Sequence, residues 1–375
     1  MNRTNDGIGG AHGAPGAPLG ANLLALRSHN TALVLDLLRT AGTEGISRLE
    51  LAERTGLTPQ AVSKITARLR ADGLAAEAGR RASTGGKPRT VLRLVPEAGH
   101  AVGVHLDRDE VRAVLVDLDG TVVDRRRAPL ALGAGADAVL ARVAGAVEAL
   151  RTPGAAGTGR PPLGVGVALP GPLDHARGVL HRVTGFPEWD GFPLRDALAR
   201  RLGVPVVVDK DTNAAALGLA VGGEGGSFAY LHLGTGLGAG LVIGGTVHRG
   251  ARTGAGEFGH QVIQLDGPRC GCGGRGCVEA LCLGAVVRGE TEEAARVLGV
   301  GAGNLVGLLD IDRVLLGGRT VEGDPEAFAR GVRAVLDARA RRTGDAAVPV
   351  RVVGGGVAEG AAQLVLAPVF GRGDG

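Results

Sequence analysis

The sequence has little cysteine, few aromatic side chains and almost no net charge. Only 4 of its 375 residues are cysteines and no signal peptide is evident, so we expect a reducing compartment and no disulfides. Aromatic residues make up 2% of the chain, but hydrophobic residues still reach 44%. We interpret this as an ordinary globular fold encoded by a genome whose composition favours Ala, Gly and Arg. A net charge of +4 does not by itself imply nucleic-acid binding, so the location of the positive charge matters more.

The chain also lacks a convincing membrane span. Its longest run without Asp, Glu, Lys or Arg is Gly225–His248. The repeated glycines and two histidines of this run predict a strand, a glycine turn and a second strand instead. We therefore expect a soluble, cytoplasmic protein that does not bind membranes.

Three of the four cysteines lie close to a histidine. His260, Cys270, Cys272 and Cys277 fall within eighteen residues, separated by glycines that allow a tight loop. A Cys3His set closes a tetrahedron, which is typical of a structural zinc site. The alternatives are a glycine-rich surface loop with free thiols, or a disulfide cluster. Cys282 follows five residues later and is better explained as a small core residue.

Two glutamates bracket this cluster, and together the residues form a pair of specific motifs. Glu257–Phe258–Gly259–His260 has the pattern ExGH, and Cys270–Glu279 has the pattern CxCGxxGCxE. Both resemble the ROK family, which groups sugar kinases with related transcriptional repressors. The resemblance implies that His260 and the three cysteines bind zinc. It also implies that Glu257, His260 and Glu279 belong to a sugar site.

The N-terminal part has a different pattern. Residues 1–21 are rich in Gly, Ala and Pro and predict a flexible arm. In residues 22–96, Ser47 and Glu50 form a capping box that opens a second helix, in which Leu49, Leu51 and Ala52 should face inward. Thr58 and Pro59 open a third helix. A basic hairpin follows, with no acidic residue between Ala78 and Pro96.

This order of elements predicts a winged helix-turn-helix domain, similar to that of ROK repressors. The alternative is an ordinary three-helix bundle with a solvated charged face. The recognition helix can present polar side chains to base edges, and the wing residues can bind phosphate or the minor groove. The expected DNA-binding residues are Gln60, Ser63, Lys64, Arg68, Arg80, Arg81, Lys87 and Arg89.

The body, residues 97–375, resembles the ROK sugar-kinase domain but departs from it at the nucleotide site. Where family kinases carry Asp-x-Gly-Gly-Thr, this chain has His105–Asp109. Carboxylates at Asp107 and Asp109 would lie close to the ATP phosphates and repel them. Arg319 also replaces a glycine that is usual on the adenosine side. Neither ATP nor Mg²⁺ is therefore expected as a cofactor.

A second phosphate loop, Leu231–Gly240, is intact as a motif. Its residues Gly234, Thr235, Gly236 and Gly238 can be a vestige of nucleotide binding or can be retained for packing.

The segment Asp209–Ala216 resembles the family's NDxNAAA motif. Asp211 corresponds to the general base of the kinases and would be catalytic only if kinase activity is retained. In a repressor it would accept a hydrogen bond from a sugar hydroxyl. Lys210 replaces an asparagine, so it either pairs with Asp211 or favours an anionic ligand. Gly185 stands where many sugar-binding members have an asparagine.

These features predict an α/β fold: an actin-like ATPase (ribonuclease H-like) two-lobed domain preceded by an α+β winged helix-turn-helix domain. The expected function is a ROK-type transcriptional regulator, a repressor with structural Zn²⁺ that binds double-stranded operator DNA and responds to a sugar or sugar-derived ligand. A homodimer or homotetramer is expected. The alternatives are an ATP-dependent, glucokinase-like sugar kinase with an accessory DNA-binding domain, and a regulator without a ligand.

Overall fold

The computed structural model describes residues 29–81, 89–151, 161–183, 187–354 and 356–372. The expected arm at residues 1–21, Lys87 of the wing and Gly185 lie outside these ranges. Within them, no helix is long and apolar enough to cross a membrane.

The N-terminal unit has three helices and a small sheet. The helices are α1 (His29–Thr40), α2 (Arg48–Thr55) and α3 (Pro59–Ala71), and the strands are β1 (Ile46–Ser47), β2 (Ala75–Arg81) and β3 (Arg89–Leu94). The sheet has the order β1-β3-β2, and β2 and β3 are the antiparallel strands of the wing. A short 3₁₀ turn, Pro96–Ala98, leads into the body and contains the division that we propose between residues 96 and 97.

The predicted caps are confirmed. Ser47 accepts a hydrogen bond from the Glu50 amide at 3.3 Å, and Glu50 Oε2 accepts one from the Ser47 amide at 2.8 Å. Thr58 caps α3 through the Ala61 amide at 3.2 Å. The inward orientation of Leu49 was wrong. Leu49 lies in the first turn of α2 and is 41% exposed, because positions 49, 51 and 52 do not share one face of a helix and the core takes Leu51 and Ala52.

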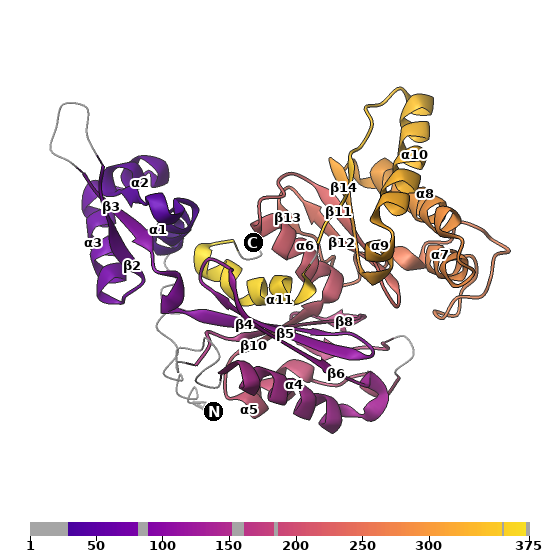
Figure 1. The fold of residues 1–375 in the computed structure, drawn as a ribbon, viewed down its shortest axis with the longest axis horizontal. Coiled ribbons are helices and arrows are strands. Elements are labelled where there is room, and N and C mark those ends of the chain that lie inside the picture. Colours follow the sequence, from indigo (N-terminus) through magenta and orange to yellow (C-terminus); the bar gives the residue numbers. More distant parts are fainter. Residues whose placement is uncertain (1–28, 82–88, 152–160, 184–186, 355, 373–375) are drawn as a thin grey trace, which may run out of the picture.

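The first lobe is built on a five-stranded sheet of order β10-β7-β4-β5-β6. Its strands are β4 (His100–Leu106), β5 (Glu110–Asp117), β6 (Val122–Pro129), β7 (Val165–Leu169) and β10 (Val206–Lys210). Helices α4 (Ala136–Arg151) and α5 (Leu194–Leu202) cover one face of the sheet, and α11 (Val357–Leu366) covers the other (Figure 1). A small hairpin, β8 (Leu173–Asp174) with β9 (Val179–Leu180), extends from the edge of the lobe.

The second lobe repeats this topology. Its sheet has the order β13-β12-β11-β14-β15, formed by β11 (Phe228–Leu233), β12 (Leu237–Ile243), β13 (Thr246–Val247), β14 (Arg313–Gly317) and β15 (Val350–Val352). In chain order, the first three strands of each sheet are antiparallel to their neighbours. The last two strands run parallel to the first. The outer face carries α7 (Val278–Val287), α8 (Thr291–Leu309), α9 (Arg319–Gly323) and α10 (Pro325–Thr343). This repeat is the two-lobed α/β plan predicted from the sequence.

Helices α6 (Asp211–Val221) and α11 pack against each other between the two sheets (Figure 1). Glycines make this close approach possible. A Cβ atom at Gly360 would lie 2.0 Å from the Ala214 carbonyl oxygen on α6, and one at Gly103 would lie 1.9 Å from the Ala358 carbonyl oxygen on α11. Both distances are far below van der Waals contact, so side chains at these positions would separate the layers.

The winged unit shares a hydrophobic core with the body. Val34, Leu35 and Leu38 of α1 belong to the same buried cluster as Leu366 and Phe370 at the C-terminal end. Polar contacts border this junction. Arg372 pairs with Asp36 at 2.8 Å, Arg39 donates to the Asp119 carbonyl at 3.0 Å, and its guanidinium carbon lies 4.7 Å from the Phe370 ring centroid. The 3₁₀ turn η7 (Ala367–Phe370), which directly follows α11, therefore contacts α1 of the winged unit, and α11 itself packs on the first lobe and on α6.

Candidate functional site

The four predicted zinc ligands come together at the start of α7. One donor atom from each of His260, Cys270, Cys272 and Cys277 lies within 4.8 Å of all the others. Cys272 Sγ is 3.8 Å from Cys277 Sγ, and Cys270 Sγ is 3.7 Å from His260 Nδ1. A tetrahedron with Zn–S bonds of about 2.3 Å requires an S–S separation of roughly 3.8 Å, so the donor set fits zinc. Cys282 lies outside the set, buried with its thiol 3.4 Å from the Ala294 carbonyl.

Local structure positions these ligands. His260 ends the 3₁₀ turn Phe258–His260, and Cys277 immediately precedes α7. An isolated antiparallel bridge joins Val262 to Cys277 and holds the two segments together. Burial raises the pKa of the Cys277 thiol to about 12, so a cation would be needed to keep this thiolate charged at neutral pH. A metal here would join the ExGH loop to the first turn of α7.

The predicted ligand residues line one cavity of about 100 Å³ between the lobes. Asp211 begins α6, where its Oδ1 accepts a hydrogen bond from the Thr212 amide at 2.7 Å. Glu279 is in the first turn of α7, and its Oε2 accepts one from the Leu237 amide at 2.9 Å. The lining includes the whole predicted set: Lys210, Asp211, Glu257, His260 and Glu279.

Lys210 is buried at the edge of this cavity. Its side chain is 3% exposed, and Nζ lies 3.1 Å from Glu257 Oε1 and 2.5 Å from the Ala255 carbonyl oxygen. The sequence left two alternatives for Lys210: pairing with Asp211, or binding an anionic ligand. In the structure Lys210 does not pair with Asp211. The ammonium group is neutralised by Glu257 instead.

A buried network lies behind Lys210. Asp209 pairs with Arg249 at 2.7 Å and accepts a hydrogen bond from Asn213 Nδ2 at 2.9 Å. Both members of the ion pair are at most 7% exposed, so this network fixes the end of β10 and the beginning of α6. The sequence reasoning did not assign a role to Arg249, since no local motif marks it.

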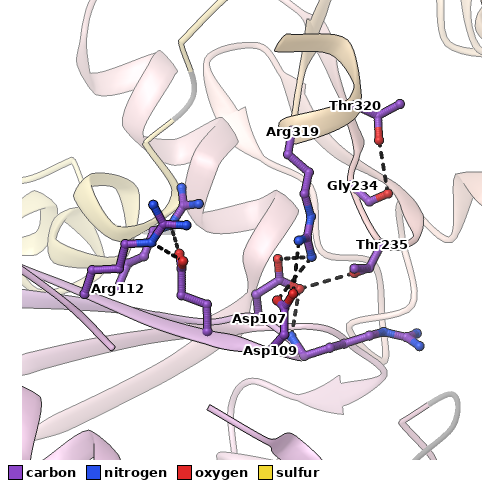
Figure 2. Close-up of polar contacts among 10 residues, drawn as sticks. Asp107, Asp109, Arg112, Gly234, Thr235, Arg319 and Thr320 are labelled. Carbon is purple, nitrogen blue, oxygen red and sulfur yellow. Dashed lines mark hydrogen bonds and ion pairs between the residues drawn. The ribbon is translucent and has the colours of Figure 1, made fainter. Parts of the chain in front are cut away.

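The turn at Asp107–Asp109, where family kinases have a phosphate loop, pairs with a residue that the sequence did not predict as its partner. Asp107 and Asp109 lie in the turn between β4 and β5, and Arg319 of α9 reaches across the cleft to both. Figure 2 shows this cluster with Thr235, which donates to Asp107 Oδ1 at 3.2 Å. The sequence reasoning treated the two aspartates and Arg319 as separate departures from the kinase pattern. Their opposite charges were the available signal that they might meet.

The second loop lies opposite this turn. Gly234, Thr235 and Gly236 connect β11 with β12, and the Gly234 amide donates to the Gly236 carbonyl at 2.9 Å. Gly238 is the second residue of β12. A Cβ atom at Gly238 would lie 3.0 Å from Thr212 Cγ2 on α6. The glycine at this position therefore allows β12 to pack closely on α6. This packing explains the presence of Gly238 without a bound nucleotide.

The predicted DNA-binding residues occupy one helix and the wing. Gln60, Ser63, Lys64 and Arg68 of α3 are exposed, and Arg68 lies 3.8 Å from Asp72 one turn later. Arg80 and Arg89 are exposed on the paired wing strands. Arg81 instead pairs with Glu50 at 3.1 Å and donates to the Gly45 carbonyl at 3.2 Å. It connects the wing to α2.

The fold and these sites define a class: two-lobed, actin-like proteins with a winged helix-turn-helix unit. Comparison with known proteins identifies the family. A model of the ROK family matches residues 101–294, and a model described as winged helix-turn-helix DNA-binding matches residues 34–75. The chain belongs to the ROK family.

Three relatives illustrate the range of similarity. The xylose repressor of Caldicellulosiruptor bescii is 30% identical over 261 residues, 69% of this chain and only 64% of that protein's own length. A solved ROK-family transcriptional regulator, a homologue of the Escherichia coli Mlc protein, has a TM-score of 0.74 at 20% identity and covers 92% of this chain and 97% of its own. A ROK glucokinase from Streptomyces griseus, solved with glucose and AMPPNP, has a TM-score of 0.60 at 26% identity, covering 71% and 99%.

The zinc assignment predicts a metal-dependent stability. Purified full-length protein should contain about one zinc per chain, and Cys272→Ser should lower both the zinc content and the melting temperature, because a structural zinc contributes directly to folding. Cys282→Ala is the matched control, since it removes a thiol outside the set. Equal zinc content in wild type and Cys272→Ser, by elemental analysis, would contradict the assignment.

His105 predicts a stability that depends on pH. Burial lowers the pKa of His105, which is 7% exposed, below its ordinary value of 6.5. Below pH 6.5 the unfolded chain therefore binds more protons than the folded protein, and the free energy of unfolding falls as the pH drops. His105→Gln should lose less stability than wild type between about pH 7.5 and 5.5, measured by urea unfolding.

The exposed His248 provides the control for this measurement. His248→Gln should keep the pH dependence of the wild type. Burial also lowers the pKa of His100, so part of the dependence should remain in every variant. The interpretation fails if His105→Gln and wild type lose the same free energy.

Proposed function

We propose that this chain is a ROK-family transcriptional repressor whose affinity for operator DNA responds to a neutral sugar or sugar-derived ligand. The observation that carries the proposal is the direct packing of α1 of the winged unit on the 3₁₀ turn η7 (Ala367–Phe370), which continues α11, while α11 itself packs against the sheet of the first lobe and against α6. The relative named as a xylose repressor and the solved regulator support the same function.

The charge distribution supports DNA binding through α3. It has three exposed basic residues, Lys64, Arg68 and Arg70, of which Arg70 pairs with Glu77 at 3.0 Å, and no acidic residue lies within the helix. Lys64 and Arg68 lie next to Gln60 and Ser63. Gln60 can read adenine, and Lys64 or Arg68 can read guanine or bind phosphate. Arg80 and Arg89 would contact the backbone, while Arg81 stabilises the wing through Glu50. Because most operators are two-fold symmetric, a homodimer or homotetramer is part of the proposal.

The charges around the cavity support a neutral ligand. Four carboxylates line it, from Asp107, Asp211, Glu257 and Glu279, and they outnumber the two cationic side chains of the lining, Arg108 and Lys210. The Lys210 ammonium is already paired with Glu257 and nearly inaccessible, so it offers little to an anion. Hydroxyl groups of a sugar can donate to these carboxylates without adding negative charge.

The response to ligand can be a population shift. Asp211 lies at the start of α6, and Glu257 and Glu279 belong to the second lobe. Helix α6 packs on α11, and the 3₁₀ turn η7 that follows α11 contacts α1 of the winged unit. A ligand that favours one lobe arrangement would thereby alter the placement of paired recognition helices. A change of about 10–100-fold in operator affinity needs only ~1.4–2.8 kcal/mol of differential binding.

The second candidate is a sugar kinase with an accessory DNA-binding domain. It is favoured by Asp211 at the cavity and by the similarity to the Streptomyces griseus glucokinase. We propose instead that kinase activity is lost. The Asp107–Arg319–Asp109 cluster occupies the turn that corresponds by sequence to the kinase phosphate loop, and its two carboxylates would repel a polyanion.

The recognition helix predicts the first functional experiment. Purified protein incubated with fragmented genomic DNA from its own source should protect a few discrete palindromic sites. Lys64→Ala with Arg68→Ala should weaken binding to these sites by 10-fold or more, on the order of 1–3 kcal/mol, because two base or phosphate contacts are lost.

The matched control removes the same charge elsewhere. Arg330→Ala with Arg341→Ala changes two exposed arginines of α10 and should leave operator affinity unchanged. Zinc content should stay the same in both double variants. Diffuse, salt-sensitive binding by wild type would show that the winged unit lacks base readout.

The proposed loss of kinase activity has its own prediction. In a coupled assay with ATP, Mg²⁺ and a panel of hexoses and pentoses, the wild-type protein should form no sugar phosphate above background. The reason is the electrostatic repulsion between the γ-phosphate and the carboxylates of the first loop. Phosphorylation that is abolished in Asp211→Asn would instead establish the kinase.

A further inference from the structure

One ion cluster joins the two lobes across their cleft. Arg319 is the first residue of α9 in the second lobe, and Asp107 and Asp109 belong to the β4–β5 turn of the first lobe. Arg319 Nη2 lies 3.0 Å from Asp107 Oδ2, and Nη1 lies 3.2 Å from Asp109 Oδ2. In Figure 2 the guanidinium group points between the two carboxylates. A single planar group thus binds two acids from the opposite lobe, a geometry that suits arginine and not lysine.

Further contacts fix both sides of the cluster. Thr235, from the β11–β12 turn of the second lobe, donates to Asp107 Oδ1 at 3.2 Å, and Thr320 donates to the Gly234 carbonyl at 3.4 Å. The Arg108 amide donates to Asp107 Oδ1 at 2.8 Å. The Arg319 side chain also holds the pKa of Asp109 below its usual range, so this carboxylate is charged at neutral pH. The second lobe therefore contacts the β4–β5 turn through two separate segments.

The position of the cluster relates it to the ligand cavity. Asp107 lines the cavity that contains Asp211 and Glu257, and it also lines a larger cavity of about 540 Å³. Arg319 lines the larger cavity. The cluster therefore lies between the two spaces. In a two-lobed kinase, a nucleotide bound across the cleft would contact both lobes at this position. In this chain Arg319 of the second lobe contacts Asp107 and Asp109 of the first lobe directly.

We propose that Arg319, Asp107 and Asp109 form a cross-lobe latch that replaces the bridging role of a nucleotide and holds the cleft closed over the ligand cavity. Arg319 is a positioning residue, since it acts on the cavity through Asp107. The consequence for sugar affinity rests on the proposed function, but the latch itself acts in the protein without any sugar. Because Arg319 and Asp109 are partly exposed, salt should loosen the latch.

The experiment measures hydrogen exchange in the zinc-loaded full chain without sugar. Arg319→Ala should speed exchange of the amides at residues 107–110 and 234–237 by at least fivefold, while residues 102–105 of β4 stay unchanged. Added NaCl should speed exchange of the same segments in wild type and have little effect in the variant. Arg296→Ala is the matched control, because it removes an arginine whose carboxylate partner, Glu293, lies on the same helix.

Charge reversal separates the latch from a merely structural role. Arg319→Asp should open the cleft further than Arg319→Ala, and adding Asp109→Arg to it should restore part of the protection. The proposal is overturned if Arg319→Ala matches Arg296→Ala in exchange and in salt response, or if the double reversal restores nothing.

A separate arm uses D-xylose and D-glucose as probes. If either binds wild type, the latch predicts at least fivefold weaker binding to Arg319→Ala by calorimetry, and unchanged affinity would overturn its link to the cavity. If neither sugar binds, that result counts against the ligand in the proposed function, while the exchange measurements without sugar still decide the latch.

Discussion

The close packing of α11 is the constraint on which the rest of the structure depends. This helix lies on the sheet of the first lobe, packs against α6 in front of the second, and shares a buried cluster with α1 of the winged unit. Backbone contact at Gly103 and Gly360 leaves no room for side chains between these layers. Since packed interiors respond to displacement by shifting neighbours rather than by compressing, a change in lobe position can reach the winged unit through α11 and the 3₁₀ turn η7 that follows it.

Electrostatics decides what the cleft can hold. The pocket carboxylates need hydroxyl donors or cations, and Lys210 supplies a cation only to Glu257. The aspartates of the first loop have Arg319 as their partner. A phosphate group placed beside these carboxylates would add like charge, which costs free energy. These charges are the basis on which we propose a neutral ligand and no ATP for this cleft.

A zinc ion in the Cys3His cluster would make the loop from His260 to Cys277 locally rigid. This loop is rich in glycine and has few large side chains, so burial alone offers it little stabilisation. A bound zinc would fix the position of Glu257 through His260, three residues later in the chain. It would fix Glu279 through Cys277, two residues earlier. The ligand cavity would then depend on the metal without the metal touching the ligand.

The sequence by itself determined the features that arise from short spacings. The capping box of Ser47 and Glu50, the Thr58 cap and the Cys3His set all join residues within one turn or one loop, where chain geometry limits the alternatives. The prediction that Leu49 faces inward was wrong, because a local pattern does not determine which side of a short helix packs on the core. Only the tertiary structure decided the pairing of Lys210 with Glu257 and of Arg319 with Asp107, residues 47 and 212 positions apart. Such pairs depend on how whole lobes pack, and no periodicity in the sequence encodes that.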